Sequence, residues 1–393
     1  SLSGRTLDII DPSDGQVFDR LQRSNAEDME SAVRAARHSF ETLWRPMAAA
    51  DRGRLLMRLS SAVTEHAIEL AALEQRDCGK PTRQARADAL ALARYFEFYA
   101  GACDKLHGET LPYQEGTSVL TWREPHGVTG HVIPWNYPMQ IFGRSVGGAL
   151  AAGNTCVIKP AEDACLSVLR VAQLAAEVGF PPGTINVVTG YGHEVGDALA
   201  RHPGIDHISF TGSPSVGTLI AQAAAERHCP VTLELGGKSP QIVFADADLD
   251  AALPAIVNAI VQNAGQTCSA GSRLLVERSL YEPLLERLGA LFSKLRAGPA
   301  ALDLDVGPLI RATQKERVLD FLAQAEAAGI ATVARGSVVP EAPAGGFYAA
   351  PVLLRDVPAD HRLAQEEIFG PVLCAMAFDD EDHAVQLANG TAF

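Results

Sequence analysis

The chain has 393 residues, of which 33 are Lys or Arg and 47 are Asp or Glu, so its formal net charge is −14. The hydrophobic share of 47% and the charged share of 20% are typical of a globular protein and exclude a disordered or fibrous one. The acidic balance excludes a general nucleic-acid binder and disfavours docking on an anionic membrane surface. The length predicts two or three domains of roughly 150 residues each.

Cysteine usage and hydropathy indicate the compartment. The seven cysteines are irregularly spaced and no C-x-x-C motif occurs, so neither a disulfide framework nor a thiolate metal site is expected. Residues 1–15 are polar and lack the apolar core of a signal peptide. No apolar run approaches the roughly 18 residues that a membrane-spanning helix needs. These features predict a cytoplasmic protein without a bound metal.

In chain order, the N-terminal part is predicted to be mainly helical. Ser24, with Glu27 three residues later, has the pattern of a capping box at a first helix. One amphipathic helix is predicted over 51–76 and another over 82–106. The segment 107–125 is then predicted to form a protruding β-hairpin.

Short apolar strands alternate with helices from Val128 onward, which predicts a parallel sheet with both faces covered. The right-handed crossover rule makes a doubly wound, Rossmann-like α/β layer the expected fold, with ligands at the carboxyl ends of the strands. A second α/β stretch begins after Lys238. The expected strands are 128–133, 156–159, 185–189, 207–210, 241–244 and 273–277, and the expected helices are 139–152, 165–178, 195–201, 215–225 and 249–264.

Two glycine-containing segments are candidates for nucleotide binding. The segment 190–196 has the spacing G-x-G-x-x-x-G, which is more typical of a turn than of a dinucleotide fingerprint. At the next strand-to-helix junction, Gly212 permits close backbone approach, Ser213 offers a hydroxyl, and the helix N-terminus attracts a pyrophosphate. An ordinary N-cap followed by a proline explains this junction equally well.

Three further residue types suit binding or catalysis. Lys159 and Glu162 end a strand, where they either reach ribose hydroxyls or form a surface ion pair. Cys268, in the loop GQTCSAG, is a candidate nucleophile if a base or a positive neighbour promotes its thiolate, and an inert buried thiol otherwise.

Two polar residues suit acid–base and oxyanion chemistry. Glu234 lies between two leucines, and burial there raises the pKa of a carboxyl toward the range of a general base; an exposed carboxylate at a strand edge is the alternative. Asn136, in PWNYP, either donates its amide to a developing oxyanion or stabilises a turn.

Six motifs in this order, PWNYP, KPAE, FTGS, LELGGK, GQTCSAG and EEIFGP, resemble those of the NAD(P)-dependent aldehyde dehydrogenases over essentially the whole chain. The resemblance implies an enzyme that oxidises an aldehyde to a carboxylic acid with NAD, or with NADP, through a cysteine thiohemiacetal and a thioester. It implies an NAD(P)-binding domain over 1–106 and 126–235, an oligomerisation hairpin over 107–125 and an α/β catalytic domain over 236–393. A homodimer or homotetramer is implied as well.

The resemblance also assigns roles to residues. Cys268 is implied to be the nucleophile, Asn136 to hold the oxyanion together with the Cys268 backbone N–H, and Glu234 to activate the hydrolytic water. The residues implied to bind the cofactor are Ile133, Pro134, Trp135, Lys159, Glu162, Gly212, Ser213, Val216, Leu235, Gly236, Glu367 and Phe369.

Within that set, different residues are implied to bind different parts of the cofactor. Lys159 and Glu162 are implied to hold the adenosine ribose, Ser213 the pyrophosphate and Glu367 the nicotinamide ribose, while Phe369 lies beside the nicotinamide. NAD is expected over NADP because a carboxylate at the adenosine ribose repels a 2′-phosphate.

The substrate is indicated by the helix after Asn136. Tyr137, Ile141 and Arg144 are spaced i, i+4 and i+7 and are expected to share a face, which in the family lines the aldehyde tunnel. Arg144 suits a carboxylate or another polar distal group, as in the succinate-semialdehyde and some aromatic aldehyde dehydrogenases that the chain resembles here. A structural arginine paired with a neighbouring loop is the alternative. The resemblance adds Thr267 and Ser269 to the substrate residues.

The chain departs from the family in two places. Ser145–Leu150 replaces the usual Lys-x-x-Pro-Ala-Leu, so the local helix geometry is expected to differ. Family members continue past Phe393, so the sequence as given is expected to lack the C-terminal part of the catalytic domain. The competing interpretations are a non-enzymatic or inactive protein of this fold and, less favoured because Glu234 is present, a CoA-acylating aldehyde dehydrogenase.

Overall fold

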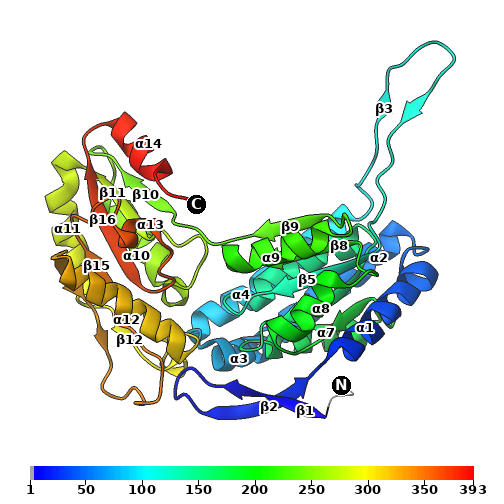
Figure 1. Cartoon of the computed structure of the whole chain (residues 1–393), viewed down its shortest axis with the longest axis horizontal. Coiled ribbons are helices and arrows are strands. Elements are labelled where there is room, and N and C mark those ends of the chain that lie inside the picture. Colours follow the sequence, from blue (N-terminus) through cyan, green and yellow to red (C-terminus); the bar gives the residue numbers. More distant parts are fainter. Residues whose placement is uncertain (1–3) are drawn as a thin grey trace. The chain divides into compact units, whose positions relative to one another are not determined.

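The structure, a computed structural model, describes residues 4–393, which divide into two compact units. Figure 1 shows the chain coloured from its N-terminus to its C-terminus. Of the described residues, the first unit contains 4–9, 19–74 and 85–234, and the second contains 10–18, 75–84 and 235–393. The short segments 10–18 and 75–84 therefore group with the C-terminal part, whereas the expected cofactor domain included all of 1–106.

The first unit is built on a five-stranded sheet in which every pair of neighbours is parallel. The strand order is β7-β6-β5-β8-β9, so the chain starts in the middle, moves to one edge, and then crosses to the other side. Ligand sites of such sheets lie where the order reverses, here beside the carboxyl ends of β5 and β8. The strands are β5 (Val128–Ile133), β6 (Thr155–Pro160), β7 (Ile185–Val187), β8 (His207–Thr211) and β9 (Val231–Glu234).

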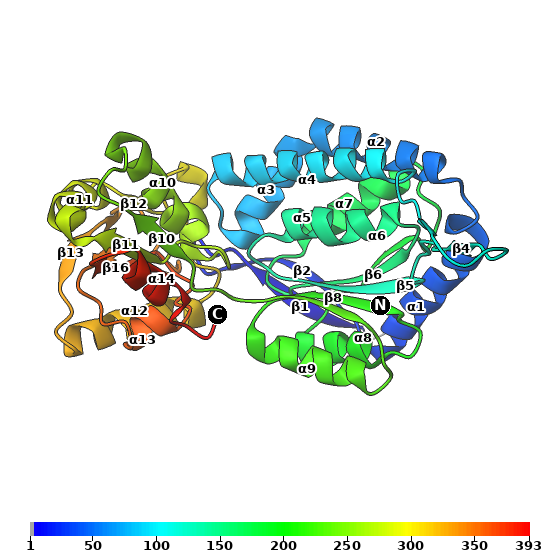
Figure 2. The ribbon, with the colours of Figure 1, turned by 90° about the horizontal axis from the view of Figure 1, so that it is seen from above.

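Helices cover both faces of this sheet, which confirms the predicted doubly wound α/β layer. In Figure 2, α2 and α4–α7 lie on one face and α1, α8 and α9 on the other. The helices of this part are α1 (Ala26–Ser39), α2 (Ala49–Glu65), α3 (Ala67–Cys78), α4 (Thr82–Ala102), α5 (Pro138–Ile141), α6 (Gly147–Ala151), α7 (Leu166–Glu177), α8 (Asp197–Arg201) and α9 (Pro214–Ala225).

Two helix predictions were wrong in detail. The capping box of α1 is formed by Asn25 and Asp28, each accepting a hydrogen bond from the backbone N–H of the other, and not by Ser24 and Glu27. The predicted single helix over 51–76 is two helices, because α2 ends at His66, whose ring Nδ1 lies 2.8 Å from the Ala62 carbonyl oxygen.

The predicted regular helix over 139–152 is interrupted by a π-helical turn, Phe142–Val146, between α5 and α6. The glycines around this turn let α4 approach closely: a Cβ on Gly143 would lie 2.9 Å from the Tyr95 ring, and one on Gly147 would lie 2.9 Å from the Tyr99 ring. Glycine and tertiary packing therefore set a geometry that the hydrophobic periodicity does not indicate. Further π-helical turns occur at Phe40–Trp44 and Gly192–Gly196.

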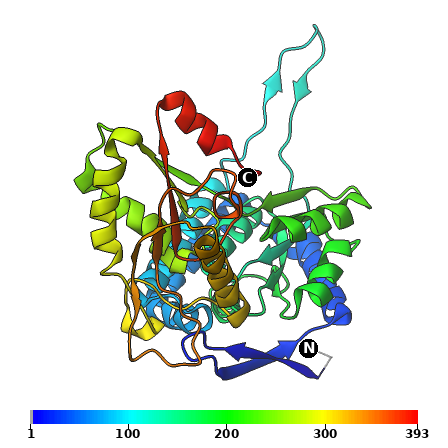
Figure 3. The ribbon, with the colours of Figure 1, turned by 60° about the vertical axis from the view of Figure 1, so that its left-hand side comes forward.

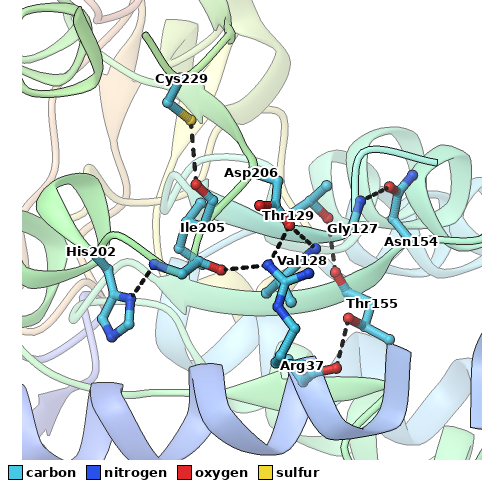
Figure 4. Close-up of polar contacts among 12 residues, drawn as sticks. Arg37, Gly127, Val128, Thr129, Asn154, Thr155, His202, Ile205, Asp206 and Cys229 are labelled. Atoms are coloured by element: carbon cyan, nitrogen blue, oxygen red, sulfur yellow. Dashed lines mark hydrogen bonds and ion pairs between the residues drawn. The ribbon is translucent and has the colours of Figure 1, made fainter. Parts of the chain in front are cut away.

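A polar cluster ties α1 to the start of the central strand (Figure 4). One oxygen of Asp206 accepts hydrogen bonds from Arg37 at 2.5 Å and from the backbone N–H of Val128 at 2.7 Å. The Asp206 N–H donates back to the Val128 carbonyl at 2.8 Å. Arg37 also donates to the carbonyl of Gly204 at 3.1 Å. Together these bonds hold α1 and the loop before β8 against β5.

The hairpin between α4 and β5 extends away from the body of its unit, as Figures 1 and 3 show. Its paired residues are few, β3 (Thr110–Leu111) and β4 (Val119–Leu120), joined in antiparallel register. Leu111, Tyr113, Leu120 and Trp122 expose large apolar side chains along it, with Trp122 at 80% exposure.

The second unit has its own five-stranded sheet, in the order β10-β11-β16-β15-β13, parallel except that β13 runs antiparallel to β15. Its large buried apolar core includes Phe292, Phe321 and Phe378. The strands are β10 (Pro240–Val243), β11 (Arg273–Glu277), β13 (Thr332–Arg335), β15 (Val352–Leu354) and β16 (Val372–Phe378). The helices are α10 (Leu249–Val261), α11 (Arg278–Phe292), α12 (Ala312–Ala327), α13 (Arg362–Gln365) and α14 (Glu381–Asn389).

Short strands and turns complete the molecule. They are β1 (Arg5–Ile10) paired with β2 (Val17–Arg23), β12 (Arg296–Ala297) paired with β14 (Ser337–Val338), and the 3-10 turns Gln262–Gly265 and Ala300–Leu302. Within residues 4–393, no helix combines the length and the apolar character needed to span a bilayer.

Candidate functional site

The loop after β5 places several predicted residues at the point where the strand order reverses. Ile133 is the buried last residue of β5, and Pro134, Trp135 and Asn136 follow it. Asn136 is 7% exposed and lies just before α5, which begins at Pro138. An amide held in this way is a fixed, uncharged hydrogen-bond donor, which suits a developing oxyanion.

The ion pair predicted at the end of β6 is present, but it is not a surface pair. The ammonium of Lys159 donates to Glu162 at 2.7 Å, and the Lys159 side chain is only 4% exposed. Because the lysine is buried against the sheet, its head is fixed at the carboxyl end of β6. The pair therefore presents one donor and one acceptor beside the loop that follows β5, a combination that can serve a vicinal diol.

The junction after β8 has the geometry of a helix N-terminus. Ser213 is the N-cap of α9, its side chain accepts a hydrogen bond from Val216 N at 3.4 Å, and Pro214 begins the helix. A Cβ on Gly212 would lie 2.6 Å from the Phe210 ring, so only glycine fits without displacing that ring. Ser213 and Val216 are exposed at this N-terminus, where an anion is favoured electrostatically.

Glu234 ends β9, the edge strand of this sheet, and its side chain is exposed. Burial between the two leucines was the wrong expectation. Alternation along a strand turns Leu233 and Leu235 to one side and Glu234 to the other, and the two leucines are partly buried while Glu234 is not. A carboxylate here is free to take up a position set by substrate and cofactor.

The three residues predicted to share a helix face are not equivalent in the structure. Tyr137 and Ile141 are buried at 8% and 6% exposure, whereas Arg144 is exposed. The π-helical turn that begins at Phe142 changes the angular step per residue, so the α-helical spacing does not extend to Arg144. Arg144 forms no ion pair within the described residues, and its carbonyl accepts a hydrogen bond from the hydroxyl of Tyr99 at 3.2 Å.

Cys268 lies on a loop whose backbone is strained. Three consecutive residues before it, Asn263, Ala264 and Gly265, have positive φ values of 48°, 55° and 73°. Gly265 is required here, since a Cβ would lie 2.2 Å from the carbonyl oxygen of Gly370. Left-handed conformations outside glycine cost of the order of 1–3 kcal/mol each and concentrate at functional sites.

A buried amide network holds this loop, and sequence reasoning did not identify it. Gln266, with 0% exposure, donates to the carbonyl of Asn263 at 3.0 Å and accepts from the backbone N–H of Ile310 at 2.9 Å. The N–H of Asn263 donates to the side chain of Gln84 at 2.9 Å. The dipeptide Asn263–Ala264 before Gly265 was the available signal, because Asn and Gly favour left-handed backbone.

Cys268 differs from most other cysteines in exposure. Five of the seven are buried, and only Cys229 and Cys268 are partly exposed. Burial raises the pKa of Cys156 to about 12 and also raises the pKa values of Cys103 and Cys374, which keeps these thiols protonated and inert. An accessible thiol on a strained loop is the arrangement expected of a nucleophile.

The two glycines of LELGGK contact other predicted site residues. A Cβ on Gly237 would lie 2.5 Å from the Cys268 carbonyl oxygen, and one on Gly236 would lie 2.4 Å from a Glu367 carboxylate oxygen. The Gly237 N–H donates to Glu367 at 3.1 Å. Burial raises the pKa of Glu367, and this hydrogen bond and the charges of Lys238 and Arg317 oppose that rise. Cys268 and Glu367 thus lie on either side of one glycine pair.

Helix α12 supports the loop that carries Glu367 and Phe369. Phe369 has a positive φ of 59°, which is rare for a bulky residue. The side chain of Gln314 donates to the carbonyls of Ile368 and Phe369 at 3.2 and 2.7 Å, and Arg317 donates to the carbonyl of Glu367 at 2.7 Å. Thr267 and Ser269 flank Cys268, and the backbone N–H of Ala270 donates to the Thr267 carbonyl.

No group of three or more His, Cys, Asp or Glu side chains is arranged to hold a metal ion in the part of the chain that the structure describes. The polar groups near the strand ends are an ammonium, a carboxylate, a hydroxyl and the glycine backbone. These groups fit a dinucleotide, since Gly212 and the N-terminus of α9 suit a pyrophosphate and the Lys159–Glu162 pair suits a ribose.

The chain is similar to a large set of known proteins. The model of the aldehyde dehydrogenase family covers residues 1–393. Aldehyde dehydrogenase (NAD(P)+) 2 of Saccharomyces cerevisiae is 39% identical over 401 residues, which is 100% of this chain and 79% of the yeast protein.

The chain is also similar to solved structures of aldehyde dehydrogenases. A provisionally assigned aldehyde dehydrogenase from Burkholderia cenocepacia is 70% identical, with a TM-score of 0.98 over 98% of this chain and 82% of that one. The NAD+ complex of an aldehyde dehydrogenase from Bacillus cereus is 38% identical, with a TM-score of 0.96 over 100% of this chain and 80% of that one.

Proposed function

The chain belongs to the aldehyde dehydrogenase family, and we propose that it oxidises an aldehyde to a carboxylic acid with NAD(P) through Cys268, Glu234 and Asn136. The observation that carries these assignments is the state of Cys268, a partly exposed thiol on a loop with three left-handed residues. In this proposal Lys159, Glu162 and Ser213 bind the dinucleotide together with Glu367, which holds the nicotinamide ribose, and Cys268 is the nucleophile.

The first half of the reaction forms a covalent intermediate. The thiolate of Cys268 attacks the aldehyde carbon, and the carbonyl oxygen becomes an oxyanion that accepts hydrogen bonds from the Asn136 amide and the Cys268 backbone N–H. Bound NAD(P) supplies the acceptor for the hydride that leaves the same carbon. The carbon–oxygen double bond re-forms as the hydride leaves, so Cys268 carries a thioester.

The second half releases the acid. The carboxylate of Glu234 takes a proton from water, the resulting hydroxide attacks the thioester carbon, and the carbon–sulfur bond breaks to return the thiolate. The exposed position of Glu234 at the end of β9 supports this role, because the base must reach a water that arrives from solvent.

Two variants test the assignments. Cys268→Ala is expected to abolish NADH formation while the dissociation constant for NAD stays within about twofold, because the nucleophile is not a cofactor ligand. Glu234→Gln is expected to give a burst of about one NADH per site followed by slow turnover, since hydride transfer precedes the hydrolysis that it impairs. Stopped-flow absorbance measures NADH formation by both variants, and a binding titration measures the dissociation constant for NAD.

Steady turnover by Cys268→Ala would contradict the assignment of Cys268. A Glu234→Gln variant with neither a burst nor slower turnover would contradict the assignment of Glu234.

We propose further that the aldehyde has an anionic or polar distal end, as a semialdehyde or a substituted aromatic aldehyde does. The support is Arg144, which is exposed on the π-helical turn close after Asn136 and forms no ion pair within the described residues. Arg144→Gln is expected to lower kcat/KM for succinate semialdehyde about tenfold or more and to leave a neutral aliphatic aldehyde within about twofold. Equal effects on both substrates would remove Arg144 from substrate recognition.

The hairpin supports a proposal on assembly. Its exposed apolar side chains, above all Trp122 and Tyr113, suit a contact between copies of the chain in a homodimer or homotetramer. Light scattering on the double variant Trp122→Ser, Tyr113→Ser is expected to give a smaller particle, and an unchanged mass contradicts this use of the hairpin.

A reduced nucleophile also suits a reducing compartment, which favours the cytoplasm.

A further inference from the structure

Lys238 is a buried ammonium for which the proposed mechanism has no role. Its side chain is 2% exposed, and its Nζ atom has no hydrogen-bond partner within the described residues. Burial lowers its pKa, against the opposing effect of nearby acidic groups. Removing an amine from water without a hydrogen bond is costly, so a lysine at this position calls for an explanation beyond packing.

The backbone of Lys238 is fixed beside the candidate site. The residue follows Gly237, whose N–H donates to the carboxylate of Glu367 at 3.1 Å. Its own carbonyl accepts a hydrogen bond from Arg273 Nε at 2.8 Å. Arg273, buried at 3% exposure, also donates to the last carbonyls of α14, at 2.7 Å to Leu387 and to Ala388. The backbone from which the Lys238 side chain departs is therefore held.

The charged and titratable groups within electrostatic reach of Lys238 are Glu366, Glu367, Arg273 and Cys374. Glu366 already pairs with Arg362, whose Nε donates to it at 2.6 Å. Cys374 is fully buried with a raised pKa, and is therefore neutral.

Glu367 is the carboxylate that remains for Lys238. Arg317 donates to its main-chain carbonyl, and among the described residues the one hydrogen bond to its side chain comes from the backbone N–H of Gly237. Burial disfavours the ionised form of this carboxylate and a nearby positive charge favours it. Lys238 carries such a charge on the residue next to that donor, and Arg317 adds a smaller effect of the same sign.

We propose that Lys238 is a positioning residue, whose buried ammonium acts through space to keep Glu367 ionised on the glycine pair and ready to accept hydrogen bonds from a ribose of the dinucleotide. This inference rests on the proposed function, in which Glu367 binds the nicotinamide ribose. An ionised carboxylate only accepts hydrogen bonds, and so suits two hydroxyl donors. A protonated one offers a competing donor and no charge.

The consequence is a specific pH dependence. Burial already raises the pKa of Glu367, and the charge of Lys238 opposes that rise. Without the ammonium, the pKa of Glu367 rises further, so the carboxyl takes up a proton at a higher pH than it does in the wild type. A carboxyl with a raised pKa becomes protonated at a higher pH. In a variant without the Lys238 charge, dinucleotide binding therefore weakens as the pH falls and recovers at high pH.

The test measures the dissociation constant for NAD by calorimetry between pH 6 and 9, with kcat and KM recorded in parallel. Lys238→Met removes the charge and keeps the apolar stem, and Lys238→Arg is the matched control that retains a cation. For Lys238→Met the Kd is expected to rise at least about threefold from pH 8.5 to pH 6, and kcat at saturating NAD to change less than about twofold. Lys238→Arg is expected to follow the wild-type profile. Lys238→Gln serves the same purpose if the Met variant does not fold.

Glu367→Gln separates failure of the inference from failure of the proposed function. If Glu367→Gln leaves the Kd for NAD unchanged, the carboxylate does not bind the cofactor and the assignment of Glu367 fails. If Glu367→Gln weakens NAD binding but Lys238→Met and Lys238→Gln show the wild-type pH profile, Lys238 is only structural and the inference is overturned. In the double variant Lys238→Met, Glu367→Gln, the added pH dependence is expected to disappear.

Discussion

Gly237 illustrates how one hydrogen atom in place of a side chain sets the position of Cys268, the proposed nucleophile. An added Cβ would lie 2.5 Å from the Cys268 carbonyl oxygen, so Gly237→Ala must displace that backbone. A displacement approaching 1 Å is expected to lower kcat about 10- to 100-fold. Gly101→Ala is the matched control, because a Cβ there meets no heavy atom within 4 Å and Gly101 lies in α4. Steady-state kinetics with melting temperatures checks both; similar kcat values for the two variants would contradict the role of Gly237.

For single residues, the sequence indicated which side chains suit the chemistry better than it indicated how buried or exposed those side chains are. The motifs pointed to Cys268, and its partial exposure agrees with a nucleophile. The leucines around Glu234 suggested burial, but the register of an edge strand exposes that carboxylate. The left-handed backbone at Ala264 and the orphaned ammonium of Lys238 depend on neighbours distant in sequence, such as Gln84 and Glu367. No local pattern reveals such contacts.

Among the elements, the π-helical turn Phe142–Val146 carries Arg144, the residue proposed to recognise the distal end of the substrate. The Tyr99 hydroxyl supports it by donating to the Arg144 carbonyl at 3.2 Å. Tyr99→Phe removes a bond worth about 1 kcal/mol. We therefore expect a three- to tenfold loss of kcat/KM for an anionic aldehyde, and less than about twofold for a neutral one. Tyr95→Phe is the control, because Tyr95 lies on the same helix and its hydroxyl makes no hydrogen bond within residues 4–393. Equal losses for both aldehydes, measured by NADH formation, argue against a link to Arg144.

Strand elements were predicted well where apolar runs were short and bounded. The predicted limits of β5 and β11 agree with the structure residue for residue. Helices were predicted in place but not in form. The close approach of α4 to Gly143 and Gly147 is a tertiary contact, and the break at His66 depends on a ring–carbonyl contact that the hydrophobic periodicity does not indicate. The role of 107–125 as an oligomerisation element stays a prediction.

For the whole molecule, stability is expected to fall with acid because of His131 in the central strand. Burial lowers the pKa of His131 to about 3, and its ring Nε2 lies 2.8 Å from the Thr129 hydroxyl, which donates to the Thr155 carbonyl at 3.1 Å. The folded pKa lies below the unfolded one, so the neutral ring contributes full stability above about pH 6.5, and this is lost as the pH falls toward 3.

His131→Gln is accordingly expected to reduce the fall of the melting temperature between pH 6.5 and pH 4.5. The wild type should lose about 2–3 kcal/mol through this residue between pH 6.5 and pH 4.5. The variant should lose less over the same interval, whatever its stability at neutral pH. His38→Gln, at an exposed histidine, is the control. Melting temperatures recorded every half pH unit decide the matter, and parallel curves for wild type and His131→Gln would speak against it.

The division of the chain into interleaved segments also constrains how the molecule folds. The second unit recruits 10–18 and 75–84 from the N-terminal part, and the Tyr348 hydroxyl donates to the Ser13 carbonyl across 335 residues of sequence. Such non-local closure is entropically slow to form. During synthesis these two segments must therefore wait for residues 235–393, which emerge long after them. A fragment beginning at Leu235 would lack two segments of its own unit.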